Sequence, residues 1–484
     1  MDNKVQLITY ADRFGGKGIS AIHDFLDGKL KGVFGGVHLL PFYYPIDGTD
    51  AGYDPIDHTK IDEKIGLWAD VLNMSYEYEI TADLIVNHIS SESKEFLDVF
   101  EKGKQSKYFD LFLTKEKVFG QNGSAADIQK IYRPRPSSPF TTKKLETGEE
   151  LNLWTTFTKN QLDIDVLNEI GQKYLDNILS IFINNGIKMI RLDAAGYAIK
   201  KAGTSCFMLP ETYSFIEDIT QKSKDLGLEV LVEIHGHYTL QQEIAKRVDY
   251  VYDFALPPLV LHTIYNSSSK KLKHWFTICP KNAITVLDTH DGIGIVDVGS
   301  HANKPGLLNS EEIDTLVQEI HKRSNQTSLK ATGIAASNLD LYQVNCTYFE
   351  ALGKENNLYY MARAIQFFAP GIPQVYYAGF LAAENDMALL NRTQVGRDIN
   401  RPYFSFDEIE ESLQKPVVQR LIELMKFRNN HPSFNGHFEL LPSDDHMLSI
   451  NWTNDSYWSS LKVDFLKQTV QVGYGNESTS SILS

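Results

Sequence analysis

The sequence has few cysteines, no excess of positive charge and no long hydrophobic run. Its cysteines, Cys206, Cys279 and Cys346, are far apart and odd in number, which argues against a disulfide framework or a zinc site. Lys and Arg number 47 against 62 Asp and Glu, a net charge of −15, and such acidity disfavours nucleic acid and anionic membranes as partners. No run approaches the roughly 18–20 apolar residues that cross a bilayer. The start shows no secretory signal, so we expect a cytoplasmic protein.

Short apolar runs alternate with segments of helical periodicity along most of the 484 residues. Near-continuous hydrophobicity in so short a run is typical of a strand buried on both faces, as in a parallel sheet covered by helices. The eight runs with this pattern are residues 5–10, 36–42, 81–88, 189–193, 229–235, 250–256, 283–288 and 372–377. They predict an α/β fold, a (β/α)8 TIM barrel, with a doubly wound open sheet as the competing arrangement.

Two connections are too long for barrel loops, and we expect each to form an inserted subdomain. Alternating short runs near the end indicate a small antiparallel β domain. In the second insertion Asn309 and Glu312 predict a helix cap, and the end of the chain, 476–484, is expected to fray. We therefore expect the catalytic barrel in three parts, 1–88, 166–291 and 355–432, with subdomain B at 89–165, subdomain B′ at 292–354 and the C-terminal β domain at 433–484.

Polar side chains recur where the predicted strands end. The carboxyl ends of barrel strands meet at one mouth, which is where such enzymes place their active sites. The residues at these positions are Asp50, His88, Arg191, Asp193, Glu233, His235, His290 and Asp291. Carboxylates, imidazoles and an arginine around one small volume suit a hydroxyl-rich ligand without a metal ion, and we expect no cofactor.

Asp193 and Glu233 form the pair with a specific chemical use. They end adjacent predicted strands, which lie about 4.8 Å apart, and this spacing suits the roughly 5–5.5 Å carboxylate separation of retaining glycosidic mechanisms. Arg191 lies on the same face as Asp193, and we expect its guanidinium to lower the pKa of Asp193 and keep it ionised. Partial burial of Glu233 would raise its pKa and make it a proton donor.

Each of these residues also has a purely structural interpretation. Arg191 and Asp193 could form a buried ion pair, Glu233 could be a solvated loop residue, and either His88 or His290 could be a core histidine. Their joint occurrence at the strand ends of one barrel favours a functional site. A non-catalytic sugar-binding barrel is the alternative of another class.

Four motifs, in order and at strand ends, resemble the α-amylase superfamily, glycoside hydrolase family 13. They are DLIVNH at 83–88, IRLDAAGY at 190–197, VEIH at 232–235 and LDTHDG at 287–292. Further stretches are similar to the sucrose phosphorylase branch of that family. These are IYRPRP at 131–136, QLDID at 161–165, AGTSCFM at 202–208, YDFALPP at 252–258, NLDLYQVN at 338–345, PGIPQVYY at 370–377 and GRDINR at 396–401.

The resemblance implies a role for each matching residue. It implies Asp193 as nucleophile, Glu233 as general acid/base and Asp291 as stabiliser of the transition state. The implied substrate contacts are Arg191, His88 and His290 around the glucosyl unit, Asp50 and Arg397 at its far edge, Phe157 and Tyr53 as an aromatic wall, Gln161 and His235 beside them, and Arg135, Tyr342 and Gln343 on the acceptor side. Tyr53 stands where the branch usually has Phe, and His237 and residues 402–404 also depart from its pattern.

The activity implied by the resemblance is transfer of glucose from sucrose to inorganic phosphate. The products would be fructose and α-glucose 1-phosphate, formed with retention through a covalent β-glucosyl enzyme. Same-branch alternatives are phosphorylases for sucrose 6′-phosphate, glucosylglycerol or glucosylglycerate, and a simple hydrolase is a further alternative. Pro134 and Leu341 favour plain sucrose. A homodimer is left open as the assembly.

Overall fold

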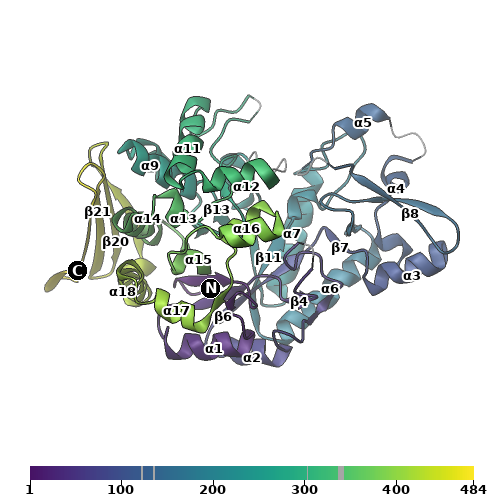
Figure 1. Ribbon diagram of the computed structural model, residues 1–484, viewed down its shortest axis with the longest axis horizontal. Helices are drawn as coiled ribbons and strands as arrows, with labels where there is room; N and C mark the ends of the chain where they lie inside the picture. Colours follow the sequence, from purple (N-terminus) through teal and green to yellow (C-terminus); the bar gives the residue numbers. More distant parts are fainter. Residues whose placement is uncertain (49, 121–123, 134–136, 302, 336–342, 484) are drawn as a thin grey trace.

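Eight parallel strands close into one barrel in this computed structural model (Figure 1). The structure describes residues 1–48, 50–120, 124–133, 137–301, 303–335 and 343–483, with the side chains of 332–335 excepted. Around the barrel, the neighbouring strands are β1 (Gln6–Thr9), β3 (Gly36–Leu39), β6 (Glu79–Ile85), β11 (Ile187–Asp193), β12 (Glu229–Val232), β13 (Tyr250–Asp253), β14 (Ala283–Thr285) and β17 (Ile372–Tyr376). Each lies within or overlaps one of the eight predicted runs, so the barrel prediction is confirmed and the open sheet is wrong.

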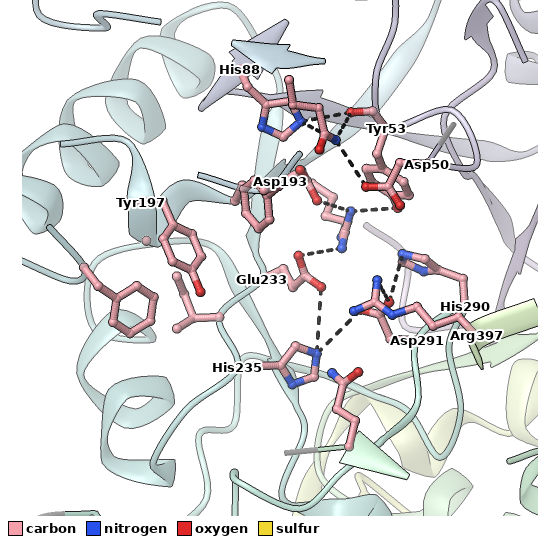
Figure 2. A pocket seen from close by; sticks show the side chains of 18 residues that line it. Asp50, Tyr53, His88, Asp193, Tyr197, Glu233, His235, His290, Asp291 and Arg397 are labelled. Carbon is pink, nitrogen blue, oxygen red and sulfur yellow. Dashed lines mark hydrogen bonds and ion pairs between the residues drawn. The ribbon is translucent and has the colours of Figure 1, made fainter. Parts of the chain in front are cut away.

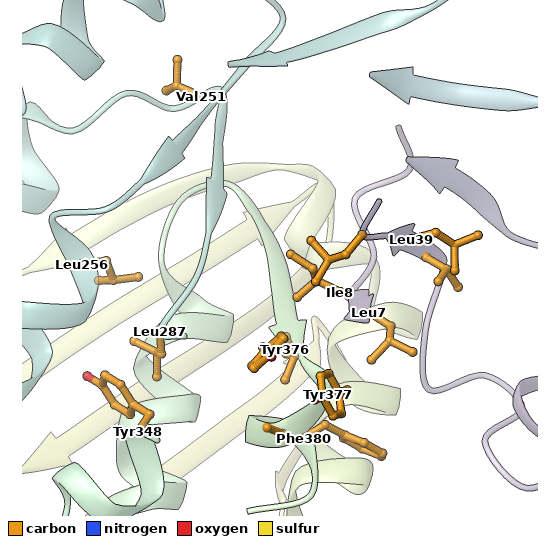
Figure 3. Close-up of a cluster of buried hydrophobic side chains, with 14 of the residues drawn as sticks. Leu7, Ile8, Leu39, Val251, Leu256, Leu287, Tyr348, Tyr376, Tyr377 and Phe380 are labelled. Atoms are coloured by element: carbon orange, nitrogen blue, oxygen red, sulfur yellow. The ribbon is translucent and has the colours of Figure 1, made fainter. Parts of the chain in front are cut away.

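Helices follow the strands and cover the outside of the barrel. They include α1 (Ile19–Gly28), α2 (Trp68–Ser75), α6 (Glu169–Asn184), α7 (Pro210–Asp225), α8 (Tyr238–Ile244), α9 (Leu256–Asn266), α10 (Lys270–Ile278), α14 (Asn356–Phe368) and α18 (Pro416–Asn430). Apolar side chains such as Leu7, Leu39 and Phe380 belong to one buried cluster that joins strands to the covering elements (Figure 3). Within the described ranges, no helix is long and apolar enough to span a membrane.

The first long connection carries a small structure of its own, far from the C-terminal end of the molecule (Figure 1). Strand β7 (His88–Ser90) pairs with β10 (Gln161–Asp163), and both reach the mouth of the barrel. Between them lie α3 (Lys94–Lys102), α4 (Lys115–Phe119), α5 (Ala125–Gln129) and the hairpin of β8 (Phe140–Lys144) with β9 (Glu150–Trp154). The residue boundaries assigned to this and the other subdomains stay predictions.

The second long connection begins and ends at a two-stranded sheet. Strand β15 (Ile293–Gly294) pairs with β16 (Gln343–Val344), and α11 (Ser310–Arg323) and α12 (Thr327–Ala335) lie between them in the chain. Asn309 and Glu312 form the predicted capping box at the start of α11. The two ends of this connection therefore lie side by side.

The C-terminal part is a five-stranded antiparallel sheet, as predicted. Its strands are β19 (His437–Leu441), β20 (Met447–Asn454), β21 (Tyr457–Asp464), β22 (Thr469–Asn476) and β23 (Thr479–Leu483). The expected fraying of 476–484 is wrong, because β23 pairs with β22 through the last described residues. A hairpin turn at Asn476, whose side-chain oxygen accepts from the backbone of Ser478 and Thr479, directs that pairing.

A buried lysine joins the first inserted segment to the barrel. The ammonium of Lys200 lies 2.8 Å from the Asp163 carboxylate and 2.8 Å from the side-chain oxygen of Asn87, and it also contacts the Tyr197 carbonyl. The side chains of Lys200 and Asp163 are 1% and 0% exposed. Because a buried charge is costly without its partner, this contact holds β10 against the strand-end loops.

We predict that Lys200→Met destabilises the fold by about 3–5 kcal/mol, since it leaves the Asp163 carboxylate buried and uncompensated. The neighbouring variant Lys201→Met is a matched control, because Lys201 pairs with Glu211 on the surface, where both side chains are largely exposed. Its effect should stay below about 1 kcal/mol. Denaturant unfolding followed by circular dichroism measures both, and equal losses in the two variants would contradict the linking role of Lys200.

Candidate active site

Side chains on alternate residues of β11 point into the barrel and stack in layers toward its mouth. Met189 belongs to a small apolar cluster inside the barrel, and Arg191 and Asp193 follow on the same face at the next layers. Leu192 pairs with Val232 across β11 and β12. The residues that follow them, Asp193 and Glu233, therefore reach the mouth at the same height on adjacent strands, as the sequence predicts.

The Arg191 guanidinium lies between the carboxylates of three neighbouring strands. Its Nη1 contacts Asp83 and lies 3.2 Å from Asp193 Oδ1, and its Nη2 lies 2.6 Å from Glu233 Oε2. Nη1 also donates to the Tyr53 hydroxyl at 3.0 Å. Arg191 is 2% exposed, so these contacts act away from bulk solvent. Asp193 and Glu233 point into the pocket together (Figure 2).

The pKa of Asp193 shifts in the direction opposite to the sequence-based expectation. Burial opposes ionisation of Asp83, but Arg191 and His38 hold its pKa at about 2. Burial raises the pKa of Asp193 well above its usual value, and Glu233 and Asp83 add to the rise while Arg191 opposes it. The net shift of the Asp193 pKa is therefore opposite to the one expected from Arg191 alone. One guanidinium does not balance three carboxylates, so the cluster favours retaining a proton.

Asp291 lies in a second group of charges on the opposite side of the pocket. Its Oδ1 is 2.8 Å from Arg397 Nη1 and 3.8 Å from Arg401 Nη2. Burial opposes its ionisation, but Arg397, His290 and His235 hold the pKa of Asp291 well below the usual range. Asp291 is thus a fixed negative charge that faces Glu233 and His235.

The remaining pocket walls are aromatic rings and neutral polar groups. The Gln161 amide donates to Asp50 Oδ2 at 3.2 Å and to the Tyr53 carbonyl at 3.1 Å. The His290 ring is stacked on Tyr53 with centroids 5.1 Å apart, and His88 packs against Phe157 at 5.3 Å. Burial lowers the pKa of both His88 and His290, so these imidazoles are neutral donors and acceptors suited to hydroxyl groups.

The structure brings nearly all of the predicted site residues into one pocket (Figure 2). These are Asp50, Tyr53, His88, Phe157, Gln161, Arg191, Asp193, Glu233, His235, His290, Asp291, Gln343 and Arg397. Arg135 and Tyr342, like Pro134 and Leu341, lie outside the described residues. His237 caps α8 and contacts the Pro305 carbonyl instead of lining the pocket.

Some residues of the site were missed from the sequence. Tyr197, Phe207 and Ile234 also line the pocket, and Asp83 supports it from below through Arg191. The sequence could have indicated Asp83, because a charged residue inside an apolar strand must have a buried partner. Phe207 lies within the stretch AGTSCFM at 202–208, but it comes from a loop that no periodicity places.

One group of side chains in the described part of the chain has the spacing of metal ligands. Glu233, His235 and Asp291 bring ligand atoms within 4.8 Å of one another. Arg191 and Arg397, however, already bind the two carboxylates at 2.6 and 2.8 Å. Guanidinium groups so close to these carboxylates oppose a further cation by charge repulsion, and we assign no metal there.

A comparison with models of known protein families identifies the catalytic domain to which this barrel belongs. The model of the α-amylase catalytic domain matches residues 24–292, more than half of the chain. The chain belongs to the α-amylase family. Within the α-amylase family, a sucrose phosphorylase of Agrobacterium vitis is 54% identical over 96% of both chains. A sucrose phosphorylase of Bifidobacterium adolescentis is 50% identical over 95% of this chain and 92% of its own.

Other members of the α-amylase family that resemble the chain carry different names. A glucosylglycerol phosphorylase of Marinobacter adhaerens is 40% identical over 99% of this chain and 98% of its own. The crystal structure of a sucrose 6F-phosphate phosphorylase from Thermoanaerobacter thermosaccharolyticum superposes with a TM-score of 0.91 at 38% identity, covering 100% of this chain and 99% of that one. The likeness extends over the whole chain, beyond the catalytic barrel.

We predict that the Asp83 carboxylate gives the protein an acid-sensitive part of its stability. Its folded pKa of about 2 is below the ordinary 3.8, so its contribution, about 2 kcal/mol, is present above pH 4 and is lost as the pH falls toward 2. The free energy of unfolding of Asp83→Asn should therefore fall less over this range than that of the unmutated protein. Asp27→Asn, which breaks an exposed pair with Lys31, is the control. An unchanged pH slope in Asp83→Asn would show that Arg191 does not stabilise this carboxylate.

Proposed function

We propose that the protein transfers a glucosyl unit from sucrose to inorganic phosphate, with retention, and releases fructose and α-glucose 1-phosphate. The observation that carries the proposal is the pair Asp193 and Glu233 on one guanidinium, at matching positions of adjacent strands. Such a pair suits a double displacement. The names of the 54% and 50% identical relatives support sucrose as donor and phosphate as acceptor.

In the first step, Asp193 attacks the anomeric carbon of the glucosyl unit and the bond to the fructose oxygen breaks. Glu233 gives its proton to that oxygen, so fructose leaves as a neutral alcohol. For this step, the proton that the carboxylate cluster retains must be on Glu233, and Asp193 must be ionised. The Arg191 contacts to both groups allow this distribution, since one guanidinium stabilises whichever carboxylate is ionised.

In the second step, phosphate attacks the same carbon from the side that fructose has left. Glu233, now ionised, accepts the proton of the attacking phosphate oxygen, and the bond to Asp193 breaks. Two inversions give the α-configured product. Positive charge develops on the sugar ring in both transition states, and the fixed negative charge of Asp291 would stabilise it.

We assign the neutral wall of the pocket to the glucosyl unit. His88, His290 and Gln161 offer hydrogen-bonding groups for ring hydroxyls, and Phe157 with Tyr53 offers apolar ring faces. Asp50 and Arg397 would bind the hydroxyls at the far end. Arg135, Tyr342 and Gln343 would serve the acceptor side.

Incubating the pure protein with sucrose and phosphate tests the proposal most simply. We expect α-glucose 1-phosphate and fructose in equal amounts, followed by 31P and 1H NMR. Free glucose as the only glucosyl product would indicate a hydrolase that uses water as acceptor. Presenting sucrose, sucrose 6′-phosphate, glucosylglycerol and glucosylglycerate together, with phosphate, separates the related phosphorylases. We expect sucrose to be consumed first, and preferential loss of another donor would replace sucrose in the proposal.

We predict that Glu233→Gln lowers turnover of sucrose by about 10²–10⁴-fold, the usual contribution of a general acid. A donor with a good leaving group, such as α-glucosyl fluoride, should lose far less in its first step, because departing fluoride needs no proton. Glu243→Gln is the control, since Glu243 lies on the surface of α8 and pairs with Lys246 and Arg247. Unchanged sucrose turnover in Glu233→Gln would overturn the assigned role, whereas sucrose binding without any product in the unmutated protein would favour the non-catalytic sugar-binding barrel.

A further inference from the structure

Asp297 is a buried carboxylate behind the pocket, in the turn that follows β15. It is fully buried and does not line the pocket. Its Oδ1 accepts hydrogen bonds from the Gly236 backbone N–H and the Gln241 amide, both at 3.2 Å, and its Oδ2 lies 3.1 Å from His235 Nδ1. All three partners belong to the segment that follows Glu233. Asp297 therefore ties the second long connection to the loop that carries a proposed catalytic residue.

The approach of Asp297 to His235 requires a glycine at position 294. A Cβ at Gly294 would lie 2.3 Å from Asp297 Oδ2 and 3.4 Å from His235 Nδ1. Gly294 also pairs with Gln343 across β15 and β16, and Gln343 lines the pocket. The backbone at this point thus leaves a space that the Asp297 carboxylate and the imidazole fill.

The contact with Asp297 fixes which ring nitrogen of His235 faces the pocket. The ring is stacked on Phe254 with centroids 3.9 Å apart and planes 15° from parallel. With Nδ1 bound to Asp297, Nε2 points toward the pocket, 3.9 Å from Glu233 Oε1 and 3.9 Å from Asp291 Oδ2 (Figure 2). Nε2 is buried and makes no hydrogen bond to a described residue. Because Nδ1 donates to Asp297, Nε2 accepts a hydrogen bond while the ring is neutral and donates one once the ring is protonated.

A phosphate ion that enters this pocket faces several carboxylates and needs a cation. Among the described residues that line the pocket, the arginines are Arg191 and Arg397. Arg191 is shared by three carboxylates, and Arg397 binds Asp291 at 2.8 Å. His235 differs from both, because its Nε2 has no hydrogen-bond partner among the described residues.

We propose that Asp297 is a positioning residue that keeps His235 positively charged and aims its Nε2–H at the acceptor phosphate. The proposal rests on the proposed function, because it assigns a cation from the described part of the pocket to the acceptor phosphate. The charged groups that face His235 are Asp297 on one side and Glu233 and Asp291 on the other. Burial opposes protonation of His235, but Asp297 first, and then Glu233 and Asp291, raise its pKa.

The kinetic test compares Asp297→Asn with the unmutated protein. The amide fills the same space without the charge, so His235 should lose its proton at a lower pH. We expect KM for phosphate to rise about tenfold or more, the usual effect of losing a charged hydrogen bond, while KM for sucrose changes less than about twofold. In the pH profile of kcat/KM for phosphate, the alkaline limb is the part where the value falls as the pH rises. This limb should move to lower pH by about one unit.

A spectroscopic test needs no variant of Asp297 and no substrate. In protein labelled with 15N-histidine, with the His235 signals assigned by their loss in His235→Gln, we expect His235 to be more than half protonated at pH 6.5, the ordinary pKa of histidine. A neutral ring at that pH would overturn the proposal. This measurement also remains decisive if Asp297→Asn does not fold.

Gln241→Met is the matched control, because it removes one hydrogen bond to Asp297 and leaves the charge. It should lower thermal stability but keep the KM for phosphate and the pH limb of the unmutated protein. If Asp297→Asn and Gln241→Met change the KM for phosphate and the pH limb in the same way, Asp297 is only a structural anchor and the proposal is wrong. If the unmutated protein makes no glucose 1-phosphate, the proposed function fails instead, and the NMR titration still shows whether His235 is charged.

Discussion

A single buried guanidinium determines where the acidic groups of the pocket lie. Arg191 binds carboxylates that arrive on three neighbouring strands, Asp83 from β6, Asp193 from β11 and Glu233 after β12. The apolar layer beneath it, which includes Met189, keeps water out and strengthens these contacts. Without this cation the carboxylates would repel one another, so the geometry proposed for catalysis depends on its contacts.

The pocket divides its titratable groups by charge as well as by position. His88 and His290 are buried and kept neutral, whereas His235 is placed among carboxylates that favour its charged form. Asp291 stays ionised because Arg397 binds it. A neutral wall faces the proposed glucosyl unit, and the charged groups gather where bonds would be made and broken.

The sequence allowed the barrel and most of the pocket to be predicted, for a physical reason. Buried parallel strands are continuous apolar runs, and the residues that follow them, such as Asp193 and Glu233, meet at one mouth. Strand β23 was not predictable, because its polar residues pair only through the neighbouring β22. The raised pKa of Asp193 depends on burial and several neighbours at once. Asp297 was missed because it is 62 residues from His235 and follows no barrel strand.

The most direct test of the account is to trap the covalent intermediate. Glu233→Gln, incubated with α-glucosyl fluoride in the absence of phosphate, should accumulate glucosyl enzyme, because the second step lacks its base. Peptide mass spectrometry should then find the glucosyl group on the peptide that contains Asp193. A label on another carboxylate, or fluoride release with no labelled peptide, would contradict the central claim that Asp193 is the nucleophile held beside Glu233 by Arg191.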